Sequence, residues 1–188
     1  MRSRFLPEGR LLHTPENEAA CASRDGLRRA MEEETVLEGV AQLCDGAHNL
    51  LVSVGPFTGF LPREEAALGI AEGTTREIAI LSRVGKPVCF QITALEESEG
   101  VLRPRLSRRR AQQAALEMEA AYLDRWVGRT VPVLFEEERD GLWRGHTTRY
   151  SEVAAPSGEN LHNQLRQVYI TGRAGNILQG ELCEGQEK

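Results

Sequence analysis

Alternating hydrophobic and polar positions divide the chain into two sets of short strands with one long helix between them. Apolar residues recur at every second position or form short runs bounded by turn residues, as in half-buried or buried strands. Pro62 and the acidic residues after it predict a short helical break after the third strand. The first set therefore predicts a small closed barrel. Its predicted strands are Thr35–Cys44, Asn49–Gly55, Phe57–Leu61, Lys86–Thr93 and Val101–Leu106.

The clearest helix is predicted over Ser107–Val127, where Ser107 can cap the first turn and Gly128 ends the helix. A shorter helix is predicted over Asn17–Glu33, ahead of the first barrel. The apolar stripe of the long helix is interpreted as a packing face rather than a cofactor site. Its members are Ala111, Ala115, Met118, Tyr122 and Trp126.

The second set also has five predicted strands, and Asp140 with Gly141 marks a hairpin turn within it. The predicted fold class is mainly β with helices, with two small OB-like five-stranded barrels joined by one amphipathic helix. The predicted strands are Thr130–Phe135, Leu142–Thr148, Ser151–Ala155, Gln164–Thr171 and Asn176–Leu182. The predicted organisation is a partly helical lead-in arm (1–34), a first barrel (35–106), a connecting helix (107–127), a second barrel (128–183) and a tail (184–188).

The formal net charge of −5 argues against a protein that coats nucleic acid without selectivity. Of the 23 basic residues, however, only Lys86 and Lys188 are lysines. Arginine offers a planar fork for phosphate and a flat face for bases, which suits RNA. Arginine-rich codon usage is the alternative explanation.

The four cysteines are far apart and form no C-x-x-C pair, so neither a metal site nor a redox dithiol is predicted. Reduced thiols and a cytoplasmic location are expected. The chain has no apolar stretch near 18 residues, and Met1–Arg10 lacks the apolar core of a signal peptide. No membrane partner is expected.

Catalytic and cofactor-binding motifs are absent from the sequence. It has no phosphate-binding loop, no dinucleotide-binding glycine motif, no nucleophile elbow and no H-E-x-x-H zinc motif. We therefore expect a protein without cofactors that is not itself an enzyme.

Five arginines fall within eight residues, across the end of one strand and the start of the long helix. Five arginines this close together can neutralise several phosphates. A helix N-terminus disfavours cations, so their presence there calls for a reason outside the helix. RNA would account for these residues, and the alternative is a solvated linker with incidental charge. They are Arg103, Arg105, Arg108, Arg109 and Arg110.

In the second barrel, flat rings and basic residues fall on or beside one strand and its turn. Exposed rings can stack on unpaired bases while arginines hold the backbone. Trp143 and Tyr150 could instead be half-buried core rings. The candidate RNA-binding residues here are Arg129, Trp143, Arg144, His146, Arg149 and Tyr150.

The second half resembles the TRAM domain of bacterial tRNA methylthiotransferases of the radical-SAM class. The matching stretches are Trp126–Glu137, Gly145–Val153 and Gly175–Leu182. The resemblance implies a β-barrel that holds tRNA while a separate domain performs the chemistry. The three closely spaced cysteines of a radical-SAM cluster are absent from this sequence.

The first half resembles the S-one motif, an RNA-binding barrel of ribosomal-protein-like chains in bacteria. The matching stretches are Gly59–Glu65, Gly69–Thr74, Val84–Phe90 and Leu106–Arg109. Together the two resemblances imply an RNA-binding protein with tRNA or rRNA as partner. Two alternatives remain open: the RNA-binding part of a tRNA methylthiotransferase that works with a catalytic partner, and a structural protein associated with the ribosome.

Overall fold

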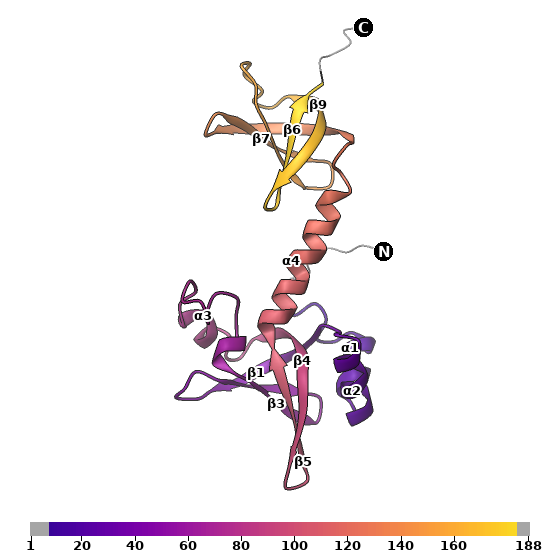
Figure 1. The fold of residues 1–188 in the computed structure, drawn as a ribbon, viewed down its shortest axis with the longest axis vertical. Coiled ribbons are helices and arrows are strands. Elements are labelled where there is room, and N and C mark those ends of the chain that lie inside the picture. Colours follow the sequence, from indigo (N-terminus) through magenta and orange to yellow (C-terminus); the bar gives the residue numbers. More distant parts are fainter. Residues whose placement is uncertain (1–7, 184–188) are drawn as a thin grey trace. The chain divides into compact units, whose positions relative to one another are not determined.

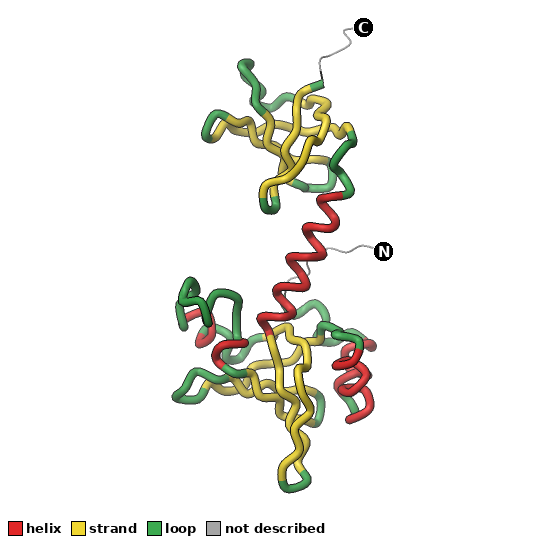
Figure 2. Tube along the Cα trace, viewed as in Figure 1, coloured by secondary structure: helices red, strands yellow, loops and turns green. Residues whose placement is uncertain are grey.

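The computed structural model describes residues 8–183, so residues 1–7 of the expected lead-in arm and the expected tail from residue 184 lie outside the described range. Two compact units divide the chain, the first ending at Leu116 and the second beginning at Glu117 (Figure 1). Figure 2 shows that strands dominate both units and that helices are few. Each unit contains one closed barrel of five strands, which confirms the predicted fold class.

The first barrel has the strand order β1-β2-β3-β5-β4, closed by a parallel contact at Phe60 and Arg105. Alternation along β2 buries Leu50, Val52 and Val54 in its core, as the sequence pattern predicts. Two short helices, η1 (Arg63–Glu65) and α3 (Ile78–Leu81), lie between β3 and β4. The strands are β1 (Leu37–Cys44), β2 (Leu50–Val54), β3 (Phe57–Leu61), β4 (Pro87–Ser98) and β5 (Val101–Ser107).

The segment before the first barrel forms two helices, α1 (Pro15–Cys21) and α2 (Arg24–Glu32), so the prediction of one helix over Asn17–Glu33 is wrong. The chain breaks at Ser23, whose hydroxyl accepts a hydrogen bond from the Gly26 amide and caps α2. Cys21, Leu27 and Ala30 are buried in the core of the first barrel. The expected lead-in arm is therefore part of the first unit from residue 8 onward.

The second barrel has the strand order β10-β8-β7-β6-β9, with β8 and β10 parallel. Asp140 and Gly141 both have positive φ angles, 55° and 77°, which confirms the predicted hairpin turn between β6 and β7. Phe135 and Ile170 are among its fully buried side chains. The strands are β6 (Thr130–Arg139), β7 (Leu142–Thr147), β8 (Glu152–Ala155), β9 (Leu165–Ala174) and β10 (Ile177–Leu182).

Helix α4 (Arg108–Asp124) contributes its first turns to the first unit and its last turns to the second. The Ser107 hydroxyl accepts a hydrogen bond from the Arg110 amide at 3.0 Å, which confirms the predicted cap. The predicted packing stripe holds only in part: Ala111 is buried, whereas Met118 is 51% exposed.

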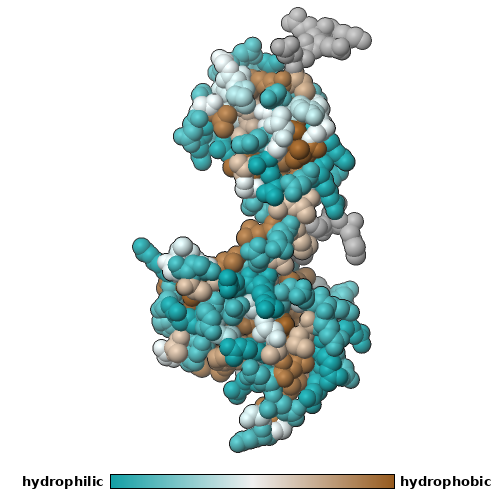
Figure 3. All heavy atoms as spheres, in the orientation of Figure 1, coloured by the Kyte–Doolittle hydropathy of each residue, from teal (hydrophilic) through white to brown (hydrophobic). Residues whose placement is uncertain are grey.

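The surface is mostly hydrophilic on the face drawn in Figure 3, where hydrophobic residues form small separate patches. No helix between residues 8 and 183 is long and apolar enough to cross a membrane.

Candidate nucleic-acid interface

A pocket of about 320 Å³ lies in the second unit, at the point where α4 ends and the barrel begins. Two aromatic rings and three arginines line it, and no carboxylate is among the lining residues. The last turn of α4, the segment between α4 and β6, and the β7–β8 turn supply these side chains. They are Tyr122, Arg125, Trp126, Arg129 and Arg149.

Tyr122 lies in the last turn of α4, and Arg125 and Trp126 follow in the turn directly after it, three and four residues further on. Leu123 is buried in the second core, and Tyr122 and Trp126 pack partly against it. Gly128 then adopts a left-handed φ of 81°, which stops the helix. Its amide donates to the carbonyl of Ile170 at 2.8 Å, so the segment is tied to strand β9.

The turn between β7 and β8 holds Arg149. Thr147 lies at its start with a buried side chain, and its hydroxyl accepts hydrogen bonds from the amides of Arg149 (3.3 Å) and Ser151 (3.2 Å). Tyr150 has a φ of 60°, which completes the tight turn. The Arg149 guanidinium carbon lies 5.7 Å from the centroid of the Trp126 ring, within the range of a cation–π contact.

The charged side chains that line the pocket are all positive. None of Arg125, Arg129 and Arg149 is ion-paired with a carboxylate in the part of the chain that the structure describes. The rings of Tyr122 and Trp126 meet edge to face at 6.1 Å. Unpaired guanidinium groups can bind phosphate, and adjacent flat rings can stack on a base.

The Trp126 indole Nε1 is buried and has no hydrogen-bond acceptor among residues 8–183. Buried donors without partners are rare in folded proteins. Two other buried side-chain nitrogens, Arg83 Nε and Arg144 Nε, also have no partner among the described residues, and the Trp126 donor is the one of the three that belongs to a pocket residue.

At the arginine cluster of the first unit, three of the five guanidinium groups already have carboxylate partners. Arg105 pairs with Glu96 at 3.6 Å and lies 5.8 Å from the Phe60 ring. Arg109 pairs with Glu72 at 3.1 Å. Arg108 is 7% exposed, which corrects its predicted role, since a buried guanidinium cannot reach an RNA phosphate.

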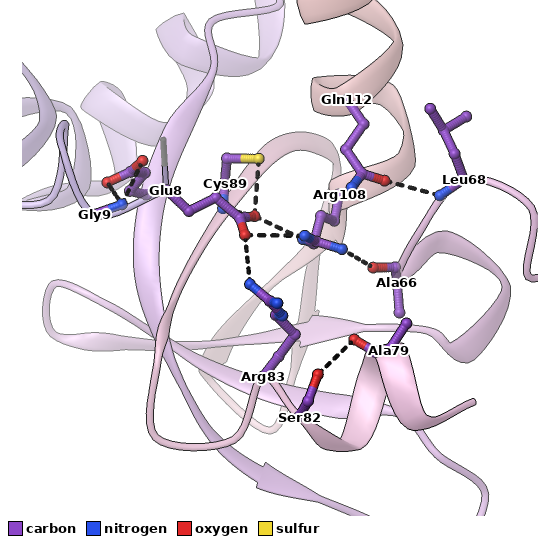
Figure 4. Close-up of polar contacts among 11 residues, drawn as sticks. Glu8, Gly9, Ala66, Leu68, Ala79, Ser82, Arg83, Cys89, Arg108 and Gln112 are labelled. Carbon is purple, nitrogen blue, oxygen red and sulfur yellow. Dashed lines mark hydrogen bonds and ion pairs between the residues drawn. The ribbon is translucent and has the colours of Figure 1, made fainter. Parts of the chain in front are cut away.

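Figure 4 shows how the Arg108 guanidinium is held. The Glu8 carboxylate accepts hydrogen bonds from Arg108 Nε at 2.7 Å and from Arg83 Nη1 at 2.9 Å, while Arg108 also donates to the carbonyl of Ala66. Burial raises the pKa of Glu8. The hydrogen bond and charge of Arg108, with the Cys89 amide, outweigh this and hold the pKa below its ordinary value.

The Cys89 thiol beside Glu8 is chemically quiet. Burial and the nearby carboxylate raise its pKa to about 12, so the thiolate needed for nucleophilic or redox chemistry does not form at neutral pH. Its sulfur also contacts Glu8 Oε1 at 3.2 Å. Glu8, Arg108 and Cys89 therefore stabilise the fold of the first unit rather than perform chemistry.

Arg103 and Arg110 are exposed, and neither has an ion pair within residues 8–183. A phosphate contact by these two side chains remains a prediction.

The residues predicted to bind RNA on the second barrel differ in burial and in ion pairing. Trp143 is 7% exposed and belongs to the core, so its predicted stacking on a base is corrected. Arg144 pairs with Glu152 at 3.1 Å, and His146 lies 3.3 Å from a Glu136 carboxylate oxygen. Tyr150 is 80% exposed, and its ring is available to a ligand.

The structure brings predicted Arg129 and Arg149 together with three residues that sequence reasoning did not assign to RNA binding. These are Tyr122, Arg125 and Trp126. The available signal was the alternation of rings and arginines at helical spacing around the end of α4. Arg149 lies in a turn of the barrel, far from these residues in the sequence, so no local pattern indicates that it joins them.

No group of three or more His, Cys, Asp or Glu side chains that could hold a metal ion occurs in residues 8–183. All four cysteines are free thiols.

No protein-family model and no curated protein matches the chain. Among solved structures it is similar to the solution structure of GSP13 from Bacillus subtilis, with 24% identity over 43% of this chain and 57% of that chain and a TM-score of 0.33. It is also similar to a multidomain protein with nucleic acid binding domains from Streptococcus pneumoniae, with 9% identity over 79% of this chain and 51% of that chain and a TM-score of 0.28. The chain thus spans just over half the length of each structure. At these TM-scores neither likeness carries an argument about function. The function is therefore inferred from the geometry of the pocket.

Proposed function

We propose that this chain is a non-catalytic RNA-binding protein whose ligand is tRNA or another structured RNA with unpaired bases. The observation that carries the proposal is the pocket at the end of α4, where three arginines without carboxylate partners surround two aromatic rings. Structured RNA exposes unstacked bases beside its phosphates, and proteins bind them with stacked rings and arginines.

The surroundings of the pocket support RNA over a small neutral ligand. Tyr150 adds an exposed ring directly after Arg149 in the chain. The pocket arginines are exposed rather than enclosed, so a large polyanion can reach them. The resemblance of the two halves to RNA-binding modules points in the same direction.

The test compares the affinity of the purified chain for bulk tRNA and for a single-stranded oligonucleotide of equal length, at low and moderate salt. Tighter and salt-sensitive binding to tRNA is expected. The double variant Arg129→Ala/Arg149→Ala should weaken binding by more than about tenfold and reduce the salt slope by about 1 to 2, because each phosphate contact contributes roughly 0.7 to 0.9 to that slope.

The matched control is Arg139→Ala/Arg166→Ala, which removes the same charge from the same unit. Both of these arginines are ion-paired, with Glu137 and Glu159, and neither lines the pocket. Affinity and salt slope should stay close to those of the unaltered chain. Equal losses in both double variants would assign the effect to net charge, and no binding to either RNA at low salt would refute the proposed function.

A further inference from the structure

The size of the pocket limits what it can hold. Ligand pockets in proteins span roughly 300 to 1,000 Å³, and this one, at about 320 Å³, is at the lower limit. This volume holds one nucleotide-sized group, and because the pocket is open to solvent the rest of an RNA chain can lie outside it. The rings of Tyr122 and Trp126 form one part of its lining, and guanidinium groups form the rest.

The charge of the pocket exceeds what one internal nucleotide requires. An internal phosphodiester carries a single negative charge, whereas a phosphate monoester carries about −1.5 to −2 at pH 7 and offers three acceptor oxygens. Three guanidinium groups without carboxylate partners line a space for one nucleotide. A terminal phosphate uses this arrangement more fully than a diester does.

The contact between Arg149 and Trp126 suits the same ligand. A cation–π contact attracts a guanidinium group to an aromatic ring through the charge distribution of the ring and uses no hydrogen-bond acceptor. The N–H groups of a guanidinium form the planar fork that matches two phosphate oxygens at once. The Arg149 guanidinium carbon lies 5.7 Å from the Trp126 centroid, and its N–H groups have no acceptor among residues 8–183, so they are available to a phosphate.

We propose that this pocket binds the terminal nucleotide of an RNA, with its phosphate monoester between Arg125, Arg129 and Arg149 and its base against the aromatic rings. The inference rests on the proposed function and names the part of the RNA that the pocket recognises. A phosphate monoester occurs at a 5′ end, at a 3′ end and on a free nucleotide. The experiment therefore separates these three sources.

The experiment measures fluorescence anisotropy of the full chain with one short single-stranded RNA sequence, labelled at the end opposite the one tested. It is prepared with a 5′-phosphate, with a 3′-phosphate and with hydroxyl groups at both ends. A hydroxyl-ended RNA two nucleotides longer matches the charge of the phosphorylated forms. Adenosine 5′-monophosphate, adenosine 3′-monophosphate and adenosine serve as competitors.

One phosphorylated form should bind at least about tenfold more tightly than the charge-matched hydroxyl form, as expected for several charge-assisted hydrogen bonds. The matching adenosine monophosphate should compete, and adenosine should not. Arg129→Ala/Arg149→Ala should remove the preference for the phosphorylated end, and Arg139→Ala/Arg166→Ala should retain it.

Equal affinity of the phosphorylated and charge-matched hydroxyl forms would overturn the inference while RNA binding itself stands. A preference that survives Arg129→Ala/Arg149→Ala would also overturn it, because the terminal phosphate would then bind outside the pocket. Failure of every RNA to bind at low salt would instead refute the proposed function.

Discussion

The two groups of arginines in this chain differ in what surrounds their guanidinium groups. At the end of β5 and the start of α4, Arg105, Arg108 and Arg109 each pair with a carboxylate of the first unit. At the end of the same helix, the pocket arginines have no such partner among residues 8–183. Density of arginine along the sequence therefore does not measure how much positive charge a ligand can reach.

The helix dipole helps to explain the difference. The N-terminus of a helix carries partial positive charge, so arginines there are unfavourable unless carboxylates compensate them. Glu8, Glu65 and Glu72 supply that compensation from other parts of the fold. The C-terminal end favours cations, so Arg125 and Arg129, which follow the last turn of α4, are tolerated without counter-charges.

The largest expected effect comes from removing the carboxylate that holds Arg108. Glu8→Ala leaves the Arg108 side chain, 9% exposed, as a buried charge without its partner. Loss of one member of a buried ion pair costs about 3 to 5 kcal/mol, so the first unit should unfold at clearly lower urea concentration in far-UV circular dichroism.

The second unit provides an internal reference for this measurement. Both tryptophans and all three tyrosines lie in it, so tryptophan fluorescence follows the second unit alone. The urea midpoint of the second unit, followed by tryptophan fluorescence, should not change in Glu8→Ala. The control Glu64→Ala, at an exposed site in the first unit, should change the urea midpoint of neither unit. A cost well under about 1 kcal/mol would show that water solvates Arg108 readily, and the contrast between the two arginine groups would then fail.

The pH dependence of stability tests the same pairing of Glu8 with Arg108. The pKa of Glu8 in the folded chain is lower than its ordinary value of 4.5, so the folded state binds fewer protons through this site than the unfolded state does. Its stabilising contribution is therefore complete above about pH 4.5 and declines as the pH falls through the folded pKa. The difference in urea midpoint between the unaltered chain and Glu8→Gln should be largest at neutral pH and should shrink in acid. A difference that stays constant from pH 7 to pH 3 would contradict the assigned pairing.

Elements whose signal is local could be predicted from the sequence. The alternation of Leu50, Val52 and Val54 and the turn at Asp140 and Gly141 depend only on neighbouring residues, and the structure confirms both. The break at Ser23 was missed because the apolar pattern continues across it. The deciding factor is a side-chain cap together with the close approach of Gly26 to the Ala20 carbonyl.

The availability of each arginine could not be predicted, because it depends on partners distant in sequence. Arg108 is separated by 100 positions from the carboxylate that neutralises it. Trp126 follows the end of α4, whereas Arg149 contacts its ring from the turn between β7 and β8. Such groups meet only in the folded chain, so residue type and local density indicated the chemistry but not its location.

The smallest expected effect concerns the turn that presents Arg149. Thr147→Val keeps the shape of the side chain but removes the acceptor for two amides, of which the Ser151 amide is buried. An unpaired buried donor costs about 1 to 3 kcal/mol, which should lower the urea midpoint of tryptophan fluorescence and weaken RNA binding a few-fold. Thr147→Ser should restore both, and Thr148→Val, at the exposed next position, should change neither.

The two readouts of Thr147→Val separate two ways in which a guanidinium group can be positioned. At the start of α4 the position is set by ion pairs, and at Arg149 it is set by the backbone of the turn. Reduced stability together with reduced affinity supports that distinction. Reduced stability with unchanged affinity would mean that Arg149 finds the ligand through its own side-chain freedom, and the two regions would then differ only in the presence of counter-charges.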